Sequence, residues 1–381
     1  MKRGKYFVVL LLAIFAASCV TPGKLVKKGE YDRAIHQLFE RLKKMPGDEK
    51  AADLLQEAYA EANSQNLKEI EKLRKTGDPA AWYPIYQNYN RLYKRQLYVA
   101  QLPRPALENI NFDKQDFKSH LENARTKSAA YLYAHAKKLL KSGEKPNARQ
   151  AYNELIKVSE LLANYKSVDA MIRRALVQGT DNILYVVKNK TGTFLPGPLI
   201  YRLKNINFYG IDGQFMNFDK YAEKGVAYDF IIQLNLTKAT LTPGKTLVTE
   251  KEFTQKARVK SRMKTDSSGK AIPVPEFENI KCVAKIYEQQ KTATLAGYVD
   301  FIDTRTQQIK HTTPVSGKSL FTQNYVRIDG NEKACSPDVL RLTTAGPVQF
   351  PSDNDMIMDA AGKLRDVIRD VIWKDDEYLN N

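Results

Sequence analysis

The stretch Asn182-Ile183-Leu184-Tyr185-Val186-Val187 decides the fold, because the spacing of apolar residues changes there. Before it, apolar residues recur with a period of about 3.6 residues, and Gly and Pro stand where helices would begin or end. From it onward, apolar and polar residues alternate or form short apolar runs, which is typical of strands. The sequence therefore predicts a multidomain chain, with an all-α region at 19–180 followed by an α+β domain at 181–381.

The second region is expected to form a mainly antiparallel sheet with a C-terminal helix packed on it. Strand-like segments lie at 183–187, 226–234, 246–264, 279–289, 292–302 and 319–328. Residues 242–244 (Thr-Pro-Gly) break one segment from the next, and residues 303–306 read as a hairpin turn. Residues 355–372 place Met358, Leu364 and Ile368 on one helical face, so we expect this helix to cover the sheet.

The first region contains a weak internal repeat. Its members are Gly29, Tyr31, Ala34, Ile35, Leu38 and Pro46, then Asp78, Pro79, Trp82, Ile85 and Tyr89, then Ala136, Gly143, Ala148 and Tyr152. These spacings resemble the tetratricopeptide repeat, although Tyr86 stands where that family has Gly. The resemblance implies helical hairpins at residues 24–175, in which small Ala and Gly allow close approach and large aromatic residues fill the gaps. Another all-helical bundle, packed in the same way, is the alternative. Residues 94–121 fit no repeat.

An aromatic stripe lies on the helix expected after Asp78. Trp82, Tyr86, Tyr89 and Tyr93 recur three or four residues apart and therefore share one face. Two interpretations stay open. The stripe can line a concave groove that holds a peptide, as in repeat arrays, or it can fill the core between helices with its hydroxyl groups at the rim.

The N-terminus has the features of an export signal. Lys2, Arg3 and Lys5 precede a run of 12 residues at 6–17 that is apolar and too short to span a membrane as a helix. Small residues at 16–18 then precede Cys19, an arrangement that resembles the bacterial lipoprotein signal. The resemblance implies that residues 1–18 are removed and that Cys19 carries the acyl chains. Because Val20-Thr21-Pro22-Gly23 contains no acidic residue, it also implies the outer membrane, on its periplasmic face.

Two further cysteines lie in the second region. Cys282 lies in an apolar, strand-like run, and Cys335 lies in a turn-like segment. In an oxidising compartment two thiols can pair, and a disulfide and two unpaired thiols are equal alternatives here. Neither cysteine has the close second cysteine of a redox or zinc motif, so neither kind of site is indicated.

Positive charge is concentrated in two places. The 381 residues hold 60 Lys and Arg against 43 Asp and Glu, a formal net charge of +17. Residues 19–180 hold 29 basic and 19 acidic residues, and residues 181–381 hold 28 and 24. In the strand-like segment at 246–264, every second residue near the end is a cation: Lys256, Arg258, Lys260, Arg262 and Lys264. On a regular strand these five share one face, which either binds a polyanion or is a solvated face or protected edge. Because the signal exports the chain, we expect no nucleic acid as partner.

No spacing of catalytic or metal-binding residues is present. The four histidines are His36, His120, His135 and His311, and no pair of them has metal-ligand spacing. Residues 192–197 lack the Lys-Ser/Thr of a phosphate-binding loop, and no nucleophile elbow is present. Acidic residues at 353, 355 and 359 lack the spacing of a calcium loop. We therefore expect no metal, no cofactor and no enzymatic activity.

A second resemblance concerns the last two hundred residues. Residues 298–309 read as a strand, an Asp-x-x-Thr turn and a strand, and residues 222–228 lead into an earlier strand. With the amphipathic last helix they are similar to periplasmic lipoprotein domains of the curli-assembly type and of penicillin-binding-protein activators. Those are interaction or assembly modules.

Together the resemblances imply a lipid-anchored scaffold or adaptor for envelope proteins. The alternatives are a module that binds peptidoglycan or another polyanion, as a regulator of cell-wall synthesis, and an envelope enzyme. The sequence indicates no oligomeric state.

Overall fold

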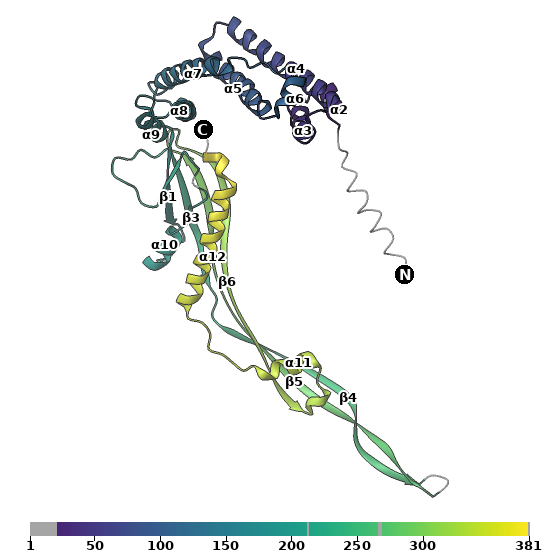
Figure 1. Ribbon diagram of the computed structural model, residues 1–381. Helices are drawn as coiled ribbons and strands as arrows, with labels where there is room; N and C mark the ends of the chain where they lie inside the picture. The colour runs from purple at the N-terminus through teal and green to yellow at the C-terminus, as the bar shows by residue number, and fades with distance from the viewer. Residues whose placement is uncertain (1–20, 212, 266–268, 380–381) are drawn as a thin grey trace. The chain divides into compact units, whose positions relative to one another are not determined.

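The computed structural model describes residues 21–211, 213–265 and 269–379. The chain divides into two compact units, with the boundary between Gly179 and Thr180. The first unit is helical, and the second combines a sheet with helices (Figure 1). This confirms the predicted order of an all-α region and an α+β domain. The predicted signal peptide and Cys19 lie outside the described residues.

The first unit is a succession of helices that pack on their neighbours in the chain. They are α2 (Pro22–Lys27), α3 (Tyr31–Lys44), α4 (Glu49–Lys75), η1 (Pro79–Ala81), α5 (Trp82–Val99), α6 (Arg104–Asn109), α7 (Phe117–Leu139), α8 (Lys145–Leu161) and α9 (Val168–Gly179). Helix α3 contacts α4, α4 contacts α5, α5 contacts α7, α7 contacts α8 and α8 contacts α9. Each contact buries an apolar face, as the period of about 3.6 residues predicts.

Side-chain caps set several of these helix starts. The carboxylate of Asp48 accepts a hydrogen bond from the N–H of Ala51 at the start of α4. Asp78 accepts from the N–H of Ala80, and Pro79 takes the first position of η1, as expected from the sequence. Gly29, with φ of +75°, makes the turn between α2 and α3.

The helices do not share one length. Helix α4 has 27 residues, α7 has 23 and α9 has 12. Between α5 and α7, where residues 94–121 fit no repeat, the chain forms the short α6 and an irregular segment at 110–116. The likeness to tetratricopeptide repeats therefore stays a prediction.

The second unit is built on one mixed, mainly antiparallel sheet. Its strands are β1 (Asp181–Asn189), β2 (Met216–Asp219), β3 (Phe230–Leu241), β4 (Lys245–Thr265), β5 (Ala271–Asp303) and β6 (Gln308–Gly330). Strand β1 pairs in parallel with both β2 and β3, whereas the β3–β5, β4–β5 and β5–β6 pairs are antiparallel. This confirms the predicted sheet, although the strand expected at 226–234 begins only at Phe230.

Strand β5 organises this sheet. It is a single strand of 33 residues where the sequence predicts two. Strands β3 and β4 run along the same side of it in turn, separated by the predicted break at 242–244, and β6 runs along the other side. At the β5–β6 turn, the carboxylate of Asp303 accepts hydrogen bonds from the N–H groups of Arg305 and Thr306 at 2.9 and 3.1 Å.

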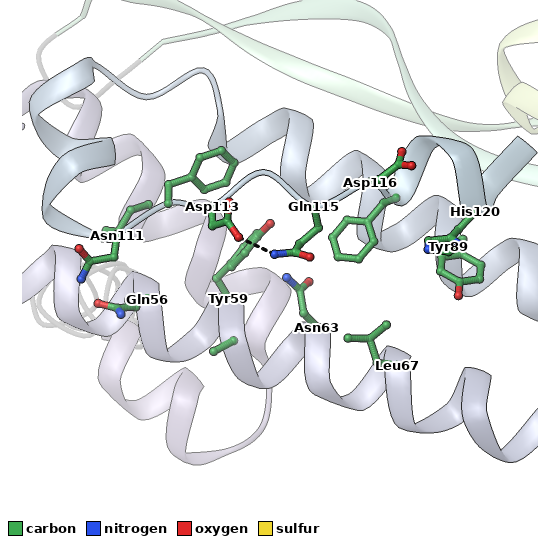
Figure 2. Close-up of a pocket in the computed structure, with 14 residues that line it drawn as sticks. Gln56, Tyr59, Asn63, Leu67, Tyr89, Asn111, Asp113, Gln115, Asp116 and His120 are labelled. Carbon is green, nitrogen blue, oxygen red and sulfur yellow. Dashed lines mark hydrogen bonds between the residues drawn. The ribbon is translucent and has the colours of Figure 1, made fainter.

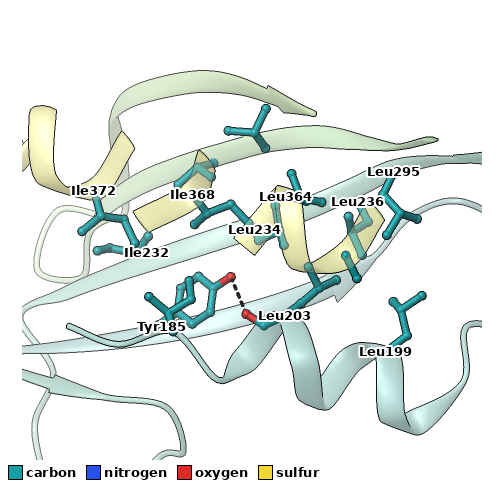
Figure 3. Packing of buried hydrophobic residues seen from close by; sticks show 14 of the residues in the cluster. Tyr185, Leu199, Leu203, Ile232, Leu234, Leu236, Leu295, Leu364, Ile368 and Ile372 are labelled. Carbon is teal, nitrogen blue, oxygen red and sulfur yellow. Dashed lines mark hydrogen bonds between the residues drawn. The ribbon is translucent and has the colours of Figure 1, made fainter. Parts of the chain in front are cut away.

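Helices α10 (Gly197–Lys204) and α12 (Asp353–Lys374) bury the main core of this unit against the sheet. The inward faces of the strands contribute Tyr185, Ile232 and Leu234, all fully buried, and α12 contributes Leu364 and Ile368 (Figure 3). The Tyr185 hydroxyl donates to the carbonyl oxygen of Leu203 at 3.3 Å, which satisfies a buried polar group. Helix α12 confirms the predicted C-terminal helix.

A smaller core lies further along the strands, where β4, β5 and β6 run side by side. It contains Cys282, Ala284, Val326, Ala334, Cys335 and Val339, and it holds η2 (Glu332–Ala334), α11 (Pro337–Arg341) and η3 (Leu342–Thr344) on the strands. Strand β6 ends at Gly330, opposite Cys282. Beyond that pair, β4 and β5 continue alone as a two-stranded ribbon (Figure 1). Helix α12 is followed by η4 (Asp376–Leu379).

Candidate functional site

A pocket of about 470 Å³ opens in the helical unit between α4, α5, the irregular segment 110–116 and the start of α7 (Figure 2). It is lined by Gln56, Tyr59, Ala60, Asn63, Leu67, Tyr89, Ile110, Asn111, Phe112, Asp113, Gln115, Asp116, Phe117 and His120. The segment that fits no repeat therefore forms one wall of this pocket.

That wall is fixed by a buried glutamine. The side chain of Gln96, only 1% exposed, donates to the carbonyl oxygen of Gln115 at 2.9 Å and accepts from its N–H at 2.8 Å. The Gln115 side chain in turn donates to the Asp113 carboxylate at 2.7 Å (Figure 2). The carboxylate of Asp116 caps α7. Hydrogen bonds that satisfy both backbone groups of one residue hold an irregular segment in one conformation.

Two aromatic side chains form the opposite wall. Tyr89 is buried, stacks on His120 with ring centroids 5.3 Å apart, and accepts a hydrogen bond from Arg74 at 3.1 Å. Tyr59 packs beside Phe112. Burial raises the pKa of Tyr59, while the nearby amide of Asn63 lowers it in part. Tyr59 is therefore a neutral phenol in the wall of the pocket.

The lining suits an extended peptide. Amide groups of Gln56 and Asn111 offer both donors and acceptors for a main chain, and leucine and phenylalanine side chains offer apolar contact. Asp113 and Asp116 supply two carboxylates, and no described Lys or Arg lines the pocket. The pocket therefore favours a segment that is neutral or basic and carries apolar side chains.

The predicted aromatic stripe divides between core and pocket. Of its four members, only Tyr89 lines the pocket. Trp82, Tyr86 and Tyr93 lie half-buried against the core between α5 and α7. Lysine and arginine side chains cover the outer rings, with Lys127 4.1 Å from the ring centroid of Trp82. The core interpretation thus describes all four residues, since Tyr89 is itself buried in this core and also lines the pocket.

The five alternating cations do not share one face, so that prediction is wrong. Arg258 pairs with Phe277 but Lys260 pairs with Glu276, because a bulge at Val259 shifts the register between β4 and β5. One extra residue reverses the direction of every side chain that follows it. Lys256 and Arg258 therefore lie on one face, and Lys260, Arg262 and Lys264 lie on the other.

The remaining predicted residues have structural positions. Cys282 and Cys335 form a disulfide, with Cα atoms 5.6 Å apart. Each histidine stacks on an aromatic ring: His36 on Tyr98, His120 on Tyr89, His135 on Tyr131 and His311 on Tyr378. Within the described residues, no group of three or more His, Cys, Asp or Glu is arranged to hold a metal ion. No described helix is long and apolar enough to span a membrane.

No known protein family and no curated protein matches the chain.

Proposed function

We propose that this protein is an adaptor lipoprotein of the bacterial envelope, which binds a segment of another protein in the pocket of its helical unit. The acylated cysteine expected at Cys19 anchors it to the membrane. The disulfide between Cys282 and Cys335 fits a chain exported to an oxidising compartment.

The fixed wall at 110–116 carries this proposal. Loops that are held rigidly beside a helical scaffold commonly carry binding groups. Here the buried Gln96 holds an irregular, polar segment against α4 and α5. The pocket between them has carboxylate and amide groups on the side of this segment and the tyrosine rings of α4 and α5 on the other side. Such a pocket offers main-chain hydrogen bonds and apolar contact to one peptide segment.

Site-specific photo-crosslinking in intact cells tests the proposal. A photoreactive amino acid at Gln56, on the exposed side of the pocket, should form an adduct with an envelope protein. The change Leu67→Lys places a cation among the pocket's lining residues, where it repels a basic segment, and should abolish that adduct. The matched control is Leu97→Lys, because Leu67 and Leu97 are each 43% exposed and Leu97 lies outside the pocket.

Two results would contradict the proposal. One is the absence of any adduct from position 56 when crosslinking from other surface positions succeeds. The other is an adduct that Leu67→Lys leaves unchanged or that Leu97→Lys removes equally. Circular dichroism is used to check that both variants are folded, so that the comparison of adducts reports on the pocket alone.

A further inference from the structure

The two-stranded ribbon beyond the disulfide has no core of its own. Residues 254–265 of β4 pair with residues 271–281 of β5, and none of these residues is buried. A two-stranded hairpin by itself is at best marginally stable in water. A ribbon that extends past its last packed layer therefore gains stability when something else covers its side chains.

Large apolar side chains are exposed along this ribbon. Strand β5 contributes Ile272, Val274 and Phe277, and β4 contributes Val259 and Met263. Phe277 is 59% exposed. Directly opposite residues in an antiparallel pair share a face. Successive side chains of a strand point to opposite faces, so Ile272 and Val274, two residues apart, share one face. Phe277, three residues after Val274, lies on the other, and the ribbon therefore has apolar side chains on both faces.

The cations also lie on both faces, as a consequence of the bulge at Val259. Lys260, Arg262 and Lys264 lie directly opposite Glu276, Val274 and Ile272, so the three cations share this face with two apolar side chains and with the carboxylates of Glu276 and Glu278. The other two cations, Lys256 and Arg258, share a face with Phe277. None of the five forms a salt bridge with another described residue. In total, residues 254–281 hold seven Lys or Arg and three Asp or Glu.

The edges of the ribbon do not favour a further strand. Pro273 and Pro275 of β5 have no N–H group, so the outer edge of β5 cannot form a continuous ladder. Strand β4 is the other edge strand and carries the five cations, and charged side chains on an edge strand disfavour pairing with a further strand. A second copy of the positively charged ribbon would be repelled. A partner must therefore meet apolar and cationic groups on both faces at once.

We propose that this ribbon, residues 256–265 with 271–279, binds an anionic lipid surface. A protein partner covers one face or one edge, whereas the headgroup region of a membrane surrounds an inserted element on every side. Apolar side chains then reach the boundary with the acyl chains, and lysine and arginine side chains pair with the lipid phosphates. The surface is separate from the pocket of the helical unit, so Leu67→Lys leaves this binding unchanged.

Tryptophan fluorescence tests the inference. The change Phe277→Trp is made in residues 19–381 with Cys19→Ala, so that neither an acyl chain nor the apolar run at 6–17 contributes to binding. With vesicles of phosphatidylglycerol, the emission of the tryptophan at position 277 should shift to the blue and be quenched by brominated acyl chains. The emission of the same chain without the new tryptophan is subtracted, which removes the signal of Trp82 and Trp373. The matched control is Phe194→Trp, at a residue 90% exposed in the second unit but outside the ribbon, which should not shift.

A charge variant tests the electrostatic part. Neutralising Lys260, Arg262 and Lys264 to Gln should weaken binding to these vesicles by roughly 100-fold, since each cation near an anionic surface adds about fivefold. The control neutralises three exposed lysines of the helical unit, Lys43, Lys137 and Lys138, and should leave binding nearly unchanged. Equal binding to phosphatidylcholine vesicles, no shift at position 277, or a shift with soluble polyglutamate but not with vesicles would each overturn the inference.

Discussion

Replacing both Cys282 and Cys335 by alanine should lower the free energy of unfolding of the second unit by about 4 kcal/mol. The two residues are 53 positions apart in the sequence. Closing a loop of that length removes roughly 14 cal/mol/K of entropy from the unfolded chain, which is about 4 kcal/mol at 25 °C. This is a large share of the stability of a domain of this size.

The place of the disulfide makes the effect local. The bond joins β5 to the segment after β6, in the smaller core that also contains Val326 and Val339. Helix α11 has only five residues and depends on that core for its structure. We therefore expect amide hydrogens of 282–290 and 332–344 to exchange much faster in the variant. Those of β1 and β3, which belong to the main core, should keep their exchange rates.

Urea unfolding measures the change in the free energy of unfolding, and hydrogen exchange followed by mass spectrometry measures the local exchange rates. The control is the unchanged chain after reduction, which loses the cross-link but keeps both sulfur atoms and should match the double variant. The reasoning is refuted if oxidised, reduced and double-alanine proteins unfold at the same urea concentration. It is also refuted if the faster exchange appears in the helical unit instead.

Three other changes have clear expected outcomes. Gly317→Ala places a Cβ atom 2.5 Å from the backbone nitrogen of Leu364, so it should cost about 1–3 kcal/mol in thermal unfolding, whereas Gly346→Ala meets no atom within 4 Å and should cost little. Burial raises the pKa of Asp303, but two backbone N–H donors and nearby cations together lower it by more, so its pKa lies below the ordinary range of an aspartate. Its stabilising effect is therefore present above about pH 4 and lost as pH falls through the lower folded value, so Asp303→Asn should destabilise at pH 7 and the difference should disappear in strong acid. At high salt, which screens the cations of the ribbon, Cys19→Ala should move the protein from the membrane to the soluble fraction, and unchanged fractionation under that condition would remove the basis for lipid anchoring.

Local patterns predict the order of elements well, because each pattern reports the burial of its own segment. The change of period at Asn182 marks the first strand, and Asp78-Pro79 marks a helix start through capping chemistry that acts within a few residues. The sequence predicts two strands where β5 is one, because Gln290 and Lys291 separate the two strand-like segments. In the structure Lys291 is buried, and its ammonium group donates to the carbonyl oxygen of Pro351 and pairs with Asp353 at 2.7 Å. Only a partner sixty residues away makes a buried lysine compatible with a strand.

The candidate surfaces depended on contacts between segments, which local patterns do not show. The pocket's fixed wall needs the side chain of Gln96 to reach the backbone of Gln115, and a single glutamine among helical residues gives no sign of this. The register of β4 is likewise a property of the pair. Its cations alternate without interruption in the sequence, but the bulge at Val259 exists only against the facing β5.

The two proposed surfaces have opposite chemistry, and this argues that they bind different partners. The pocket contains the carboxylates of Asp113 and Asp116 and no described Lys or Arg, so it repels an anionic lipid surface. The ribbon carries cations on both faces that form no salt bridge with another described residue, so it repels the basic segment that the pocket favours. Variants in one surface should therefore leave binding at the other intact. A protein that binds both of these partners joins two different components, which is what the proposed adaptor does.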